Sequence, residues 1–202
     1  MNFGVVILAA GASQRMGRSK LMLRWRDTTV LGHIRKTWED LGSRQTCVVH
    51  SASDATILSE LDRLNHPNGN RIPNPSPEAG MFGSIQCAAR WRGWDPDITH
   101  WLITLGDQPQ IRWDTLKALI EHAYVHPNQI CQPALDGRPK HPVFLPAPIF
   151  RGLADTDATD FMTCLAAHHD QTALLTASDP GLDFDLDTPA DYQEALRRFT
   201  DA

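Results

Sequence analysis

The sequence of 202 residues predicts one α/β domain built on a mostly parallel, doubly wound sheet. Short apolar segments rich in β-branched residues alternate with segments of helical periodicity through the first 125 residues. In addition, the chain opens on an apolar strand that leads directly into a glycine turn, as open α/β sheets do at their ligand-binding edge.

The expected elements alternate between strand and helix up to Val125. Phe3–Leu8 is apolar and β-branched, as a strand covered on both faces should be. Val30–Leu41 carries its apolar residues on one helical face, and Gly42 can end it. The other elements expected here are strand Gln45–His50, helix Asp54–Leu64, a short strand at Arg71–Ile72, helix Gly80–Trp91, strand His100–Leu105 and helix Asp114–Val125.

Beyond Pro133 the periodicity weakens. We expect strands near Gln129–Gln132, Val143–Leu145, Thr172–Thr176 and Phe184–Leu186, and helices near Pro148–Ala154, Asp160–His168 and Pro189–Phe199. Thr188, Pro189 and Asp191 have the order of a helix N-cap, a first-turn proline and an acid at N3. A strand over Phe184–Leu186 would place Asp183, Asp185 and Asp187 on one face.

Composition excludes several classes of protein. The formal net charge is −5 and the pI is about 5.9, so a nucleic-acid binder that neutralises phosphates is not expected. No apolar run approaches the roughly 20 residues of a membrane span, and the first ten residues have no basic region typical of a secretion signal. The four cysteines form no C-x-x-C pair, which is typical of reduced thiols in a cytoplasmic protein.

The stretch Leu8–Lys20 carries most of the chemistry. Because it follows a buried strand, it should emerge at the carboxyl edge of the sheet, where open α/β folds bind ligands. Ala9, Ala10 and Gly11 are small enough for the backbone to approach a polyphosphate, and Arg15 and Lys20 add two cations. The stretch matches neither the Walker A loop nor the dinucleotide fingerprint.

An acid is expected at the same edge of the sheet. Asp107 follows the apolar strand His100–Leu105, and a carboxylate there can hold Mg²⁺ together with substrate phosphates. Asp185 and Asp187 are candidates for a second contact with the metal, and a role for Asp187 in starting the last helix remains the alternative.

Four stretches together resemble a known family. L-A-A-G-x-x-x-R-M-G-x-x-K at Leu8–Lys20 resembles the signature loop of nucleotidyltransferases with a three-layer, Rossmann-like, mostly parallel sheet of the glycosyltransferase-A or nucleotide-diphospho-sugar transferase type. G-M-x-x-S-I at Gly80–Ile85, L-G-D-x-P at Leu105–Pro109 and D-x-D-T-P-x-D at Asp185–Asp191 are similar to later motifs of the same family. The chain is most similar to the molybdenum cofactor cytidylyltransferases and guanylyltransferases of that family.

The resemblance implies a set of site residues. Lys20, Arg15 and Asp107 would be catalytic, and Mg²⁺ would lie on Asp107 with Asp185 or Asp187. The nucleotide would be bound by Leu8, Ala9, Ala10, Gly11, Arg15, Lys20, Gly80, Met81, Ser84 and Asp107. Residues 1–132 would form the nucleotide-binding half, and residues 133–202 the acceptor-side half with the closing helix.

A basic loop is the candidate acceptor site. Gly137–Val143 resembles the family stretch G-x-x-G-H-P-V, which implies that His141 and Arg138 contact the acceptor. Lys140 stands where the relatives usually have Gly, and its charge would suit a phosphorylated acceptor. A solvent-exposed basic turn without a ligand remains the alternative.

The reaction implied is transfer of CMP from CTP to the terminal phosphate of molybdenum-molybdopterin, which releases pyrophosphate and forms the cytosine dinucleotide cofactor. CTP is preferred over GTP because guanylyl relatives usually carry a second Gly in place of Ala10. Two alternatives stay open: a cytidylyltransferase for another phosphorylated small molecule, and a non-catalytic chaperone that delivers cofactor to a molybdenum hydroxylase.

Overall fold

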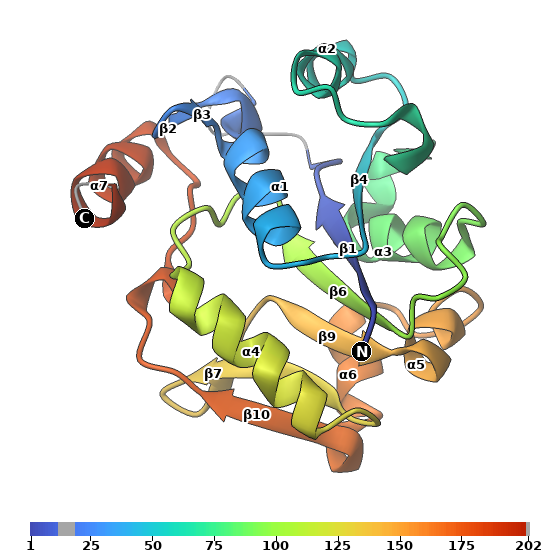
Figure 1. The fold of residues 1–202 in the computed structure, drawn as a ribbon. Helices are drawn as coiled ribbons and strands as arrows, with labels where there is room; N and C mark the ends of the chain where they lie inside the picture. Colours follow the sequence, from blue (N-terminus) through green and yellow to red (C-terminus); the bar gives the residue numbers. More distant parts are fainter. Residues whose placement is uncertain (12–18, 201–202) are drawn as a thin grey trace.

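The computed structural model describes residues 1–11 and 19–200, and its main sheet lies between two layers of helices (Figure 1). The sheet has the strand order β10-β7-β9-β6-β1-β4-β5, with β8 paired to β7. Its strands are β1 (Phe3–Leu8), β4 (Gln45–Ser51), β5 (Arg71–Asn74), β6 (His100–Leu105), β7 (Ile130–Leu135), β8 (Arg138–Pro139), β9 (Val143–Pro146) and β10 (Thr172–Thr176).

All neighbours in this order are parallel except at β9, which runs antiparallel to both β6 and β7. The mostly parallel, doubly wound sheet expected from the sequence is therefore confirmed. Strands from both sides of residue 132 belong to this one sheet, since β9 and β10 lie in the same sheet as β6 and β1.

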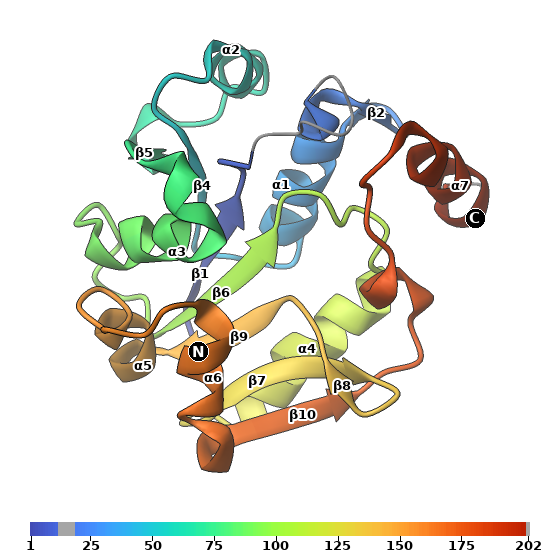
Figure 2. The same cartoon turned by 180° about the vertical axis from the view of Figure 1, so that it is seen from behind.

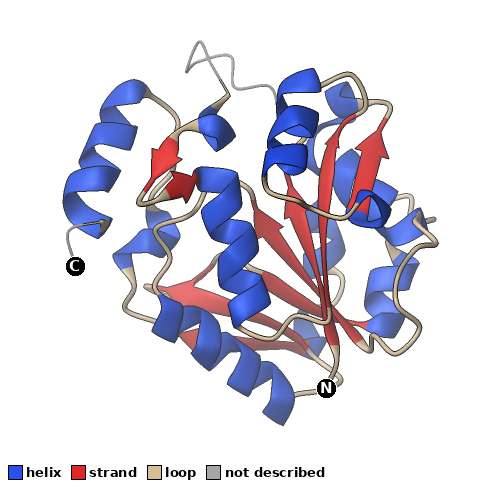
Figure 3. Cartoon of the chain, turned by 45° about the horizontal axis from the view of Figure 1, so that its top comes forward, coloured by secondary structure: helices blue, strands red, loops and turns tan. Residues whose placement is uncertain are grey.

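Helices cover both faces, as Figure 3 shows with the strands lying between them. The helices are α1 (Val30–Asp40), α2 (Ala55–Arg63), α3 (Gly80–Arg90), α4 (Trp113–Val125), α5 (Ala147–Gly152), α6 (Phe161–Ala166) and α7 (Pro189–Phe199). Apolar residues of α1, α2, α4 and α7 belong to one core cluster, and those of α3, α5 and α6 to the other. Figure 2 shows α3, α5 and α6 together on their face of the sheet.

Apolar strands explain why both faces are buried. The side chains of Val5, Val6 and Ile7 in β1 have no exposed surface, although alternate residues point to opposite faces. Val5 and Ile7 pack in the first cluster and Val6 in the second, so the strand needs helices on both sides.

Helix starts follow the side-chain chemistry read from the sequence. The Asp54 carboxylate accepts hydrogen bonds from the backbone N–H groups of Thr56 and Ile57, as expected of an N-cap. At α7 the Thr188 hydroxyl accepts from the Asp191 backbone N–H while the Asp191 carboxylate accepts from the Thr188 N–H, a capping box.

One expected strand is wrong: Phe184–Leu186 is not part of the sheet. A short 3-10 helix, Pro180–Asp183, precedes it, and the following segment leads into α7 without pairing to another strand. Acids alternate with Phe184 and Leu186 in this segment, and Leu186 is buried while Asp185 is exposed. An irregular segment can alternate in this way without pairing to a sheet.

Short elements absent from the expectation complete the chain. β2 (Arg24–Trp25) and β3 (Thr28–Thr29) form a small antiparallel ribbon beside α7, and the Tyr192 hydroxyl donates to the Arg24 carbonyl at 2.5 Å. In the described ranges, none of the helices combines the length and apolar character that a bilayer crossing requires.

Candidate active site

The site begins where β1 and β6 end side by side. Their parallel register pairs Leu8 with Leu105, so the residues that follow both strands leave the sheet at the same edge. The Gly106 backbone N–H donates to the Leu8 carbonyl oxygen at 3.0 Å. A Cβ on Gly106 would lie 2.5 Å from that oxygen, so the turn requires glycine and holds Asp107 close to the segment after β1.

Lys20 is held by two carboxylates at this edge. It opens a 3-10 helix, Lys20–Met22, and its Nζ makes an ion pair with Oδ2 of Asp107 and lies 3.4 Å from Oδ1 of Asp187. The side chains of Lys20 and Asp107 are each 20% exposed, and that of Asp187 is 32% exposed. Proximity of Asp107 to Lys20, which the sequence predicts, is therefore confirmed.

The pKa of the Lys20 ammonium is raised above its ordinary value. Burial alone would lower this pKa, but the negative charges of Asp107 and Asp187 and their hydrogen bonds outweigh that effect. Lys20 is consequently a fixed cation at neutral pH.

Asp183, Asp185 and Asp187 contact three different partners. The Asp183 carboxylate pairs with Lys140, and Asp185 Oδ1 accepts a hydrogen bond from Gln108 Nε2 at 3.3 Å. Asp187 contacts Lys20. The expectation that they share one strand face is wrong, because no strand forms there to impose alternation.

Thr188 and Asp191 form the capping box that begins α7. Asp187 lies one residue before the N-cap and its carboxylate turns to Lys20 instead. The geometry therefore favours a role for Asp187 in the charged site with Lys20 over a role in starting the last helix.

The donor set suits a hard divalent cation. Carboxylate oxygens of Asp107 and Asp187 converge on the single positive charge of Lys20, so this position already selects for a cation. Mg²⁺ is usually held by one or two carboxylates and completes its shell with water and substrate phosphates. Among the described residues no group of three or more His, Cys, Asp or Glu is arranged to hold a metal ion.

The turn after β1 is built from small residues. The Ala9 backbone N–H donates to the Val49 carbonyl at 2.8 Å, which continues the ladder with β4 past the end of β1. Ala9 is buried, Ala10 is half-buried and Gly11 is exposed with open space around it. Arg15, expected to bind the phosphates, lies outside the described residues.

The Gly80 turn presents a second loop at the same edge, since β5 runs parallel to β4. Gly80 has a φ of +76°, a conformation that side-chain-bearing residues rarely adopt, and Met81 beside it is 42% exposed. Ser84 is buried, and its hydroxyl accepts from Asn74 Nδ2 at 3.0 Å. Ser84 therefore supports the turn from inside, while Gly80 and Met81 are on its accessible side.

Asn74 is a residue that sequence reasoning missed. Its side chain is 1% exposed, holds Ser84 and accepts from the Ser76 backbone N–H at 2.9 Å. An asparagine at the end of a strand and before a proline-rich loop was the available signal.

The candidate acceptor loop divides into a buried and an exposed part. Burial lowers the pKa of His141, whose Nδ1 has no hydrogen-bond partner among the described residues, although the nearby Asp107 charge opposes this shift. Arg138 is exposed in β8. Lys140 ties the loop to Asp183, and this ion pair holds the pKa of the Asp183 carboxyl below its ordinary value.

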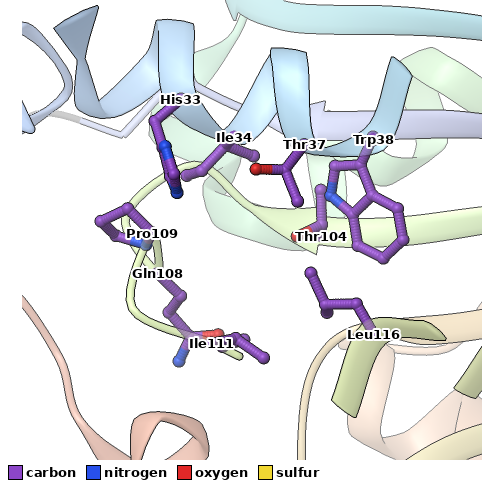
Figure 4. A pocket seen from close by; sticks show the side chains of 9 residues that line it. All are labelled: His33, Ile34, Thr37, Trp38, Thr104, Gln108, Pro109, Ile111 and Leu116. Atoms are coloured by element: carbon purple, nitrogen blue, oxygen red, sulfur yellow. The ribbon is translucent and has the colours of Figure 1, made fainter. Parts of the chain in front are cut away.

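The loop that carries Asp107 rests on α1 (Figure 4). His33 of α1 faces Pro109, and Thr37 and Trp38 line the same small cavity of about 20 Å³, roughly the size of one water molecule. Gln108 lies on the opposite wall, and its buried Oε1 has no partner among the described residues. Gln108 is a second residue that sequence reasoning did not select, although it stands inside the L-G-D-x-P motif.

Comparisons with known proteins agree with this geometry. Residues 5–173 match the model of the MobA-like NTP transferase domain. The chain is similar to a molybdenum cofactor cytidylyltransferase of Escherichia coli (26% identity, 97% of this chain, 96% of that protein) and to a molybdenum cofactor guanylyltransferase of Rhizobium johnstonii (31%, 95% and 90%).

A solved structure supports the fold. A protein of Mycobacterium tuberculosis H37Rv, determined in complex with manganese, shares 22% identity with a TM-score of 0.68 over 98% of this chain and 100% of that chain. At this identity the likeness speaks for the three-layer architecture of the nucleotide-diphospho-sugar transferase type. The chain belongs to the family of the MobA-like NTP transferase domain and is a nucleotidyltransferase.

Proposed function

We propose that the chain transfers CMP from CTP to the terminal phosphate of molybdenum-molybdopterin, with release of pyrophosphate. The observation that carries the proposal is the Lys20 ammonium held by Asp107 and Asp187 at the carboxyl edge of β1 and β6. Two relatives named for nucleotidyl transfer to the molybdenum cofactor support the class of acceptor.

The transfer needs alignment and charge neutralisation more than protein covalent chemistry. An oxygen of the acceptor phosphate forms a bond to the α-phosphorus of CTP. The bond from that phosphorus to the bridging oxygen breaks, and its electron pair leaves with pyrophosphate. A phosphate monoester is already ionised at neutral pH, so no general base is required. Lys20 would supply positive charge where it develops on the α-phosphate and the leaving group, with Arg15 as its proposed companion.

Asp107 and Asp187 would hold Mg²⁺, which acts as a Lewis acid on phosphate oxygens when bound. Their convergence on one cation supports this assignment, as does the manganese in the mycobacterial relative. Asp185 would act by orienting Gln108, because its carboxylate accepts a hydrogen bond from Gln108 Nε2.

CTP is proposed as the nucleotide because Ala10 stands where guanylyl relatives usually carry Gly. Ala10 is half-buried in the turn after β1, where a methyl group would narrow the space beside the nucleotide. We also propose a cytoplasmic location, since all four cysteines are free thiols and a reducing compartment keeps them so.

The test is pyrophosphate release from each of the four nucleoside triphosphates with molybdenum-molybdopterin and Mg²⁺. Turnover with CTP should exceed turnover with GTP. The Lys20→Ala variant should lose about 10²–10³-fold in turnover, as when one charge-stabilising group is removed from an active site. Lys36→Ala is the matched control, because Lys36 is 67% exposed and its ion pair among the described residues is with Asp40 of the same helix.

The outcomes separate the alternatives. Preference for GTP would reassign the nucleotide, and turnover only with another phosphorylated molecule would reassign the acceptor. Binding of CTP without turnover of any acceptor would favour the chaperone that serves a molybdenum hydroxylase. Full turnover by Lys20→Ala would contradict the mechanism itself.

A further inference from the structure

A cleft of about 780 Å³ lies between α1, the loop Pro109–Asp114 and the end of α7. Figure 1 shows these elements on the face of the sheet that α1 and α4 cover. Its volume falls within the range of small-molecule sites. Arg26, Arg112 and Arg198 line it together with Trp113 and Phe199, whereas Lys20, Asp107 and Asp187 do not.

Two of the guanidinium groups have neutral neighbours. Arg26 Nη2 donates to the Phe199 carbonyl at 3.3 Å, and the Arg198 guanidinium lies 5.7 and 5.4 Å from the ring centres of Phe184 and Phe199. Within the part of the chain that the structure describes, neither arginine has a carboxylate within ion-pair distance. Their charge is therefore available to an anion.

The third guanidinium is only loosely paired. Arg112 Nε lies 3.8 Å from Asp179 Oδ1, and that buried carboxylate already accepts from the backbone N–H groups of Arg112 and Gly181 and from the Thr115 hydroxyl. Among the described residues that line the cleft, Asp114 is the one acid. Three guanidinium groups thus face one lining carboxylate.

An aromatic ring stands at the same cleft. Trp113 is 44% exposed. Exposed indole faces are suited to stacking on flat rings. Gln110 also lines the cleft; it is 4% exposed, and its Oε1 has no partner among the described residues.

We propose that this cleft is a second ligand site, which binds a small anion composed of a flat ring and a phosphate. The phosphate contacts Arg198 and Arg26, with Arg112 beside them, and the ring packs against Trp113. A nucleoside monophosphate has this chemistry and is the probe for the test.

Binding is measured by calorimetry, with GMP titrated into the Lys20→Ala variant so that the carboxylate-pair site is weakened. GMP should bind with one site per chain. Adding Arg198→Ala should weaken the affinity about tenfold or more, as expected for loss of a charged hydrogen bond. Trp113→Ala should also weaken it, and Trp113→Phe should restore part of the loss.

Matched controls separate the contributions. Arg92→Ala removes an exposed arginine outside the cleft and should leave the affinity unchanged. Ribose 5-phosphate and guanosine, which each lack one half of the ligand, should bind more weakly than GMP. Urea unfolding establishes that each variant is folded.

Absence of GMP binding in the millimolar range would overturn the proposal. So would binding that Arg198→Ala and Trp113→Ala leave unchanged. The test needs no turnover, so its result is independent of the proposed transfer reaction.

Discussion

The turn at Gly106 makes the most exacting prediction about the geometry of the site. Gly106→Ala would place a Cβ 2.5 Å from the Leu8 carbonyl oxygen, and real Cβ atoms essentially never approach closer than 3.0 Å. The ends of β1 and β6 must therefore move apart by at least about 0.5 Å. Both partners in this contact are backbone or are fixed to it, so a side-chain rotation cannot relieve it.

The cost follows from two parts. Overpacking costs about 1–3 kcal/mol. Weakening of the hydrogen bond from Gly106 N–H to Leu8 adds about 1 kcal/mol. We expect the free energy of unfolding to fall by about 2–4 kcal/mol and turnover to fall about tenfold or more, because Asp107 moves relative to Lys20.

Urea unfolding followed by circular dichroism measures the stability, and pyrophosphate release measures turnover. Gly69→Ala is the matched control, since Gly69 is exposed, has no atom within 4 Å of a new Cβ and has no positive φ. A Gly106→Ala variant as stable and as active as the wild type would refute the argument.

Three further predictions use other contacts. Asp187→Asn should lower turnover by about 10²-fold, whereas Asp185→Asn should lower it much less, because Asp187 contacts Lys20 and Asp185 contacts Gln108 instead. Equal effects of the two substitutions in the pyrophosphate assay would contradict this. Burial lowers the pKa of His66 to about 4, although a hydrogen bond to the Asn70 backbone opposes the shift. Below pH 6.5 the unfolded state therefore binds more protons than the folded state, and the free energy of unfolding should fall by about 2 kcal/mol between pH 7 and pH 4.5. In urea unfolding, the His66→Gln variant should lose less stability over this pH range than the wild type. An identical pH dependence of the two proteins would contradict the role of His66. Thr188→Ala should lower the free energy of unfolding by about 1 kcal/mol, because the capping box of α7 is lost. An unchanged midpoint of urea unfolding would show that the capping box does not contribute to stability.

Local chemistry made much of the fold predictable. Phe3–Leu8 and His100–Leu105 are apolar over their full length, so their identity as central strands follows from composition. A capping residue such as Thr188 acts within a few positions of the chain, and its role was correctly predicted.

Predictions for the C-terminal part were less complete. The antiparallel direction of β9 depends on how the chain brings it between β6 and β7. The apolar run Val143–Leu145 does not indicate that direction. Phe184–Leu186 has a strand pattern but finds no partner strand, because pairing is a property of the whole sheet.

What the sequence determined by itself is the set of charged and small residues at the sheet edge: the alanines and Gly11, Lys20 and Asp107. What only the tertiary structure decided is which of these charges meet. Lys20 and Asp187 are 167 positions apart, and Asp185 turns to Gln108 although it lies two residues from Asp187. The physical reason is that backbone and capping preferences act over a few residues, whereas an ion pair forms wherever packing brings two side chains together, which no local pattern specifies.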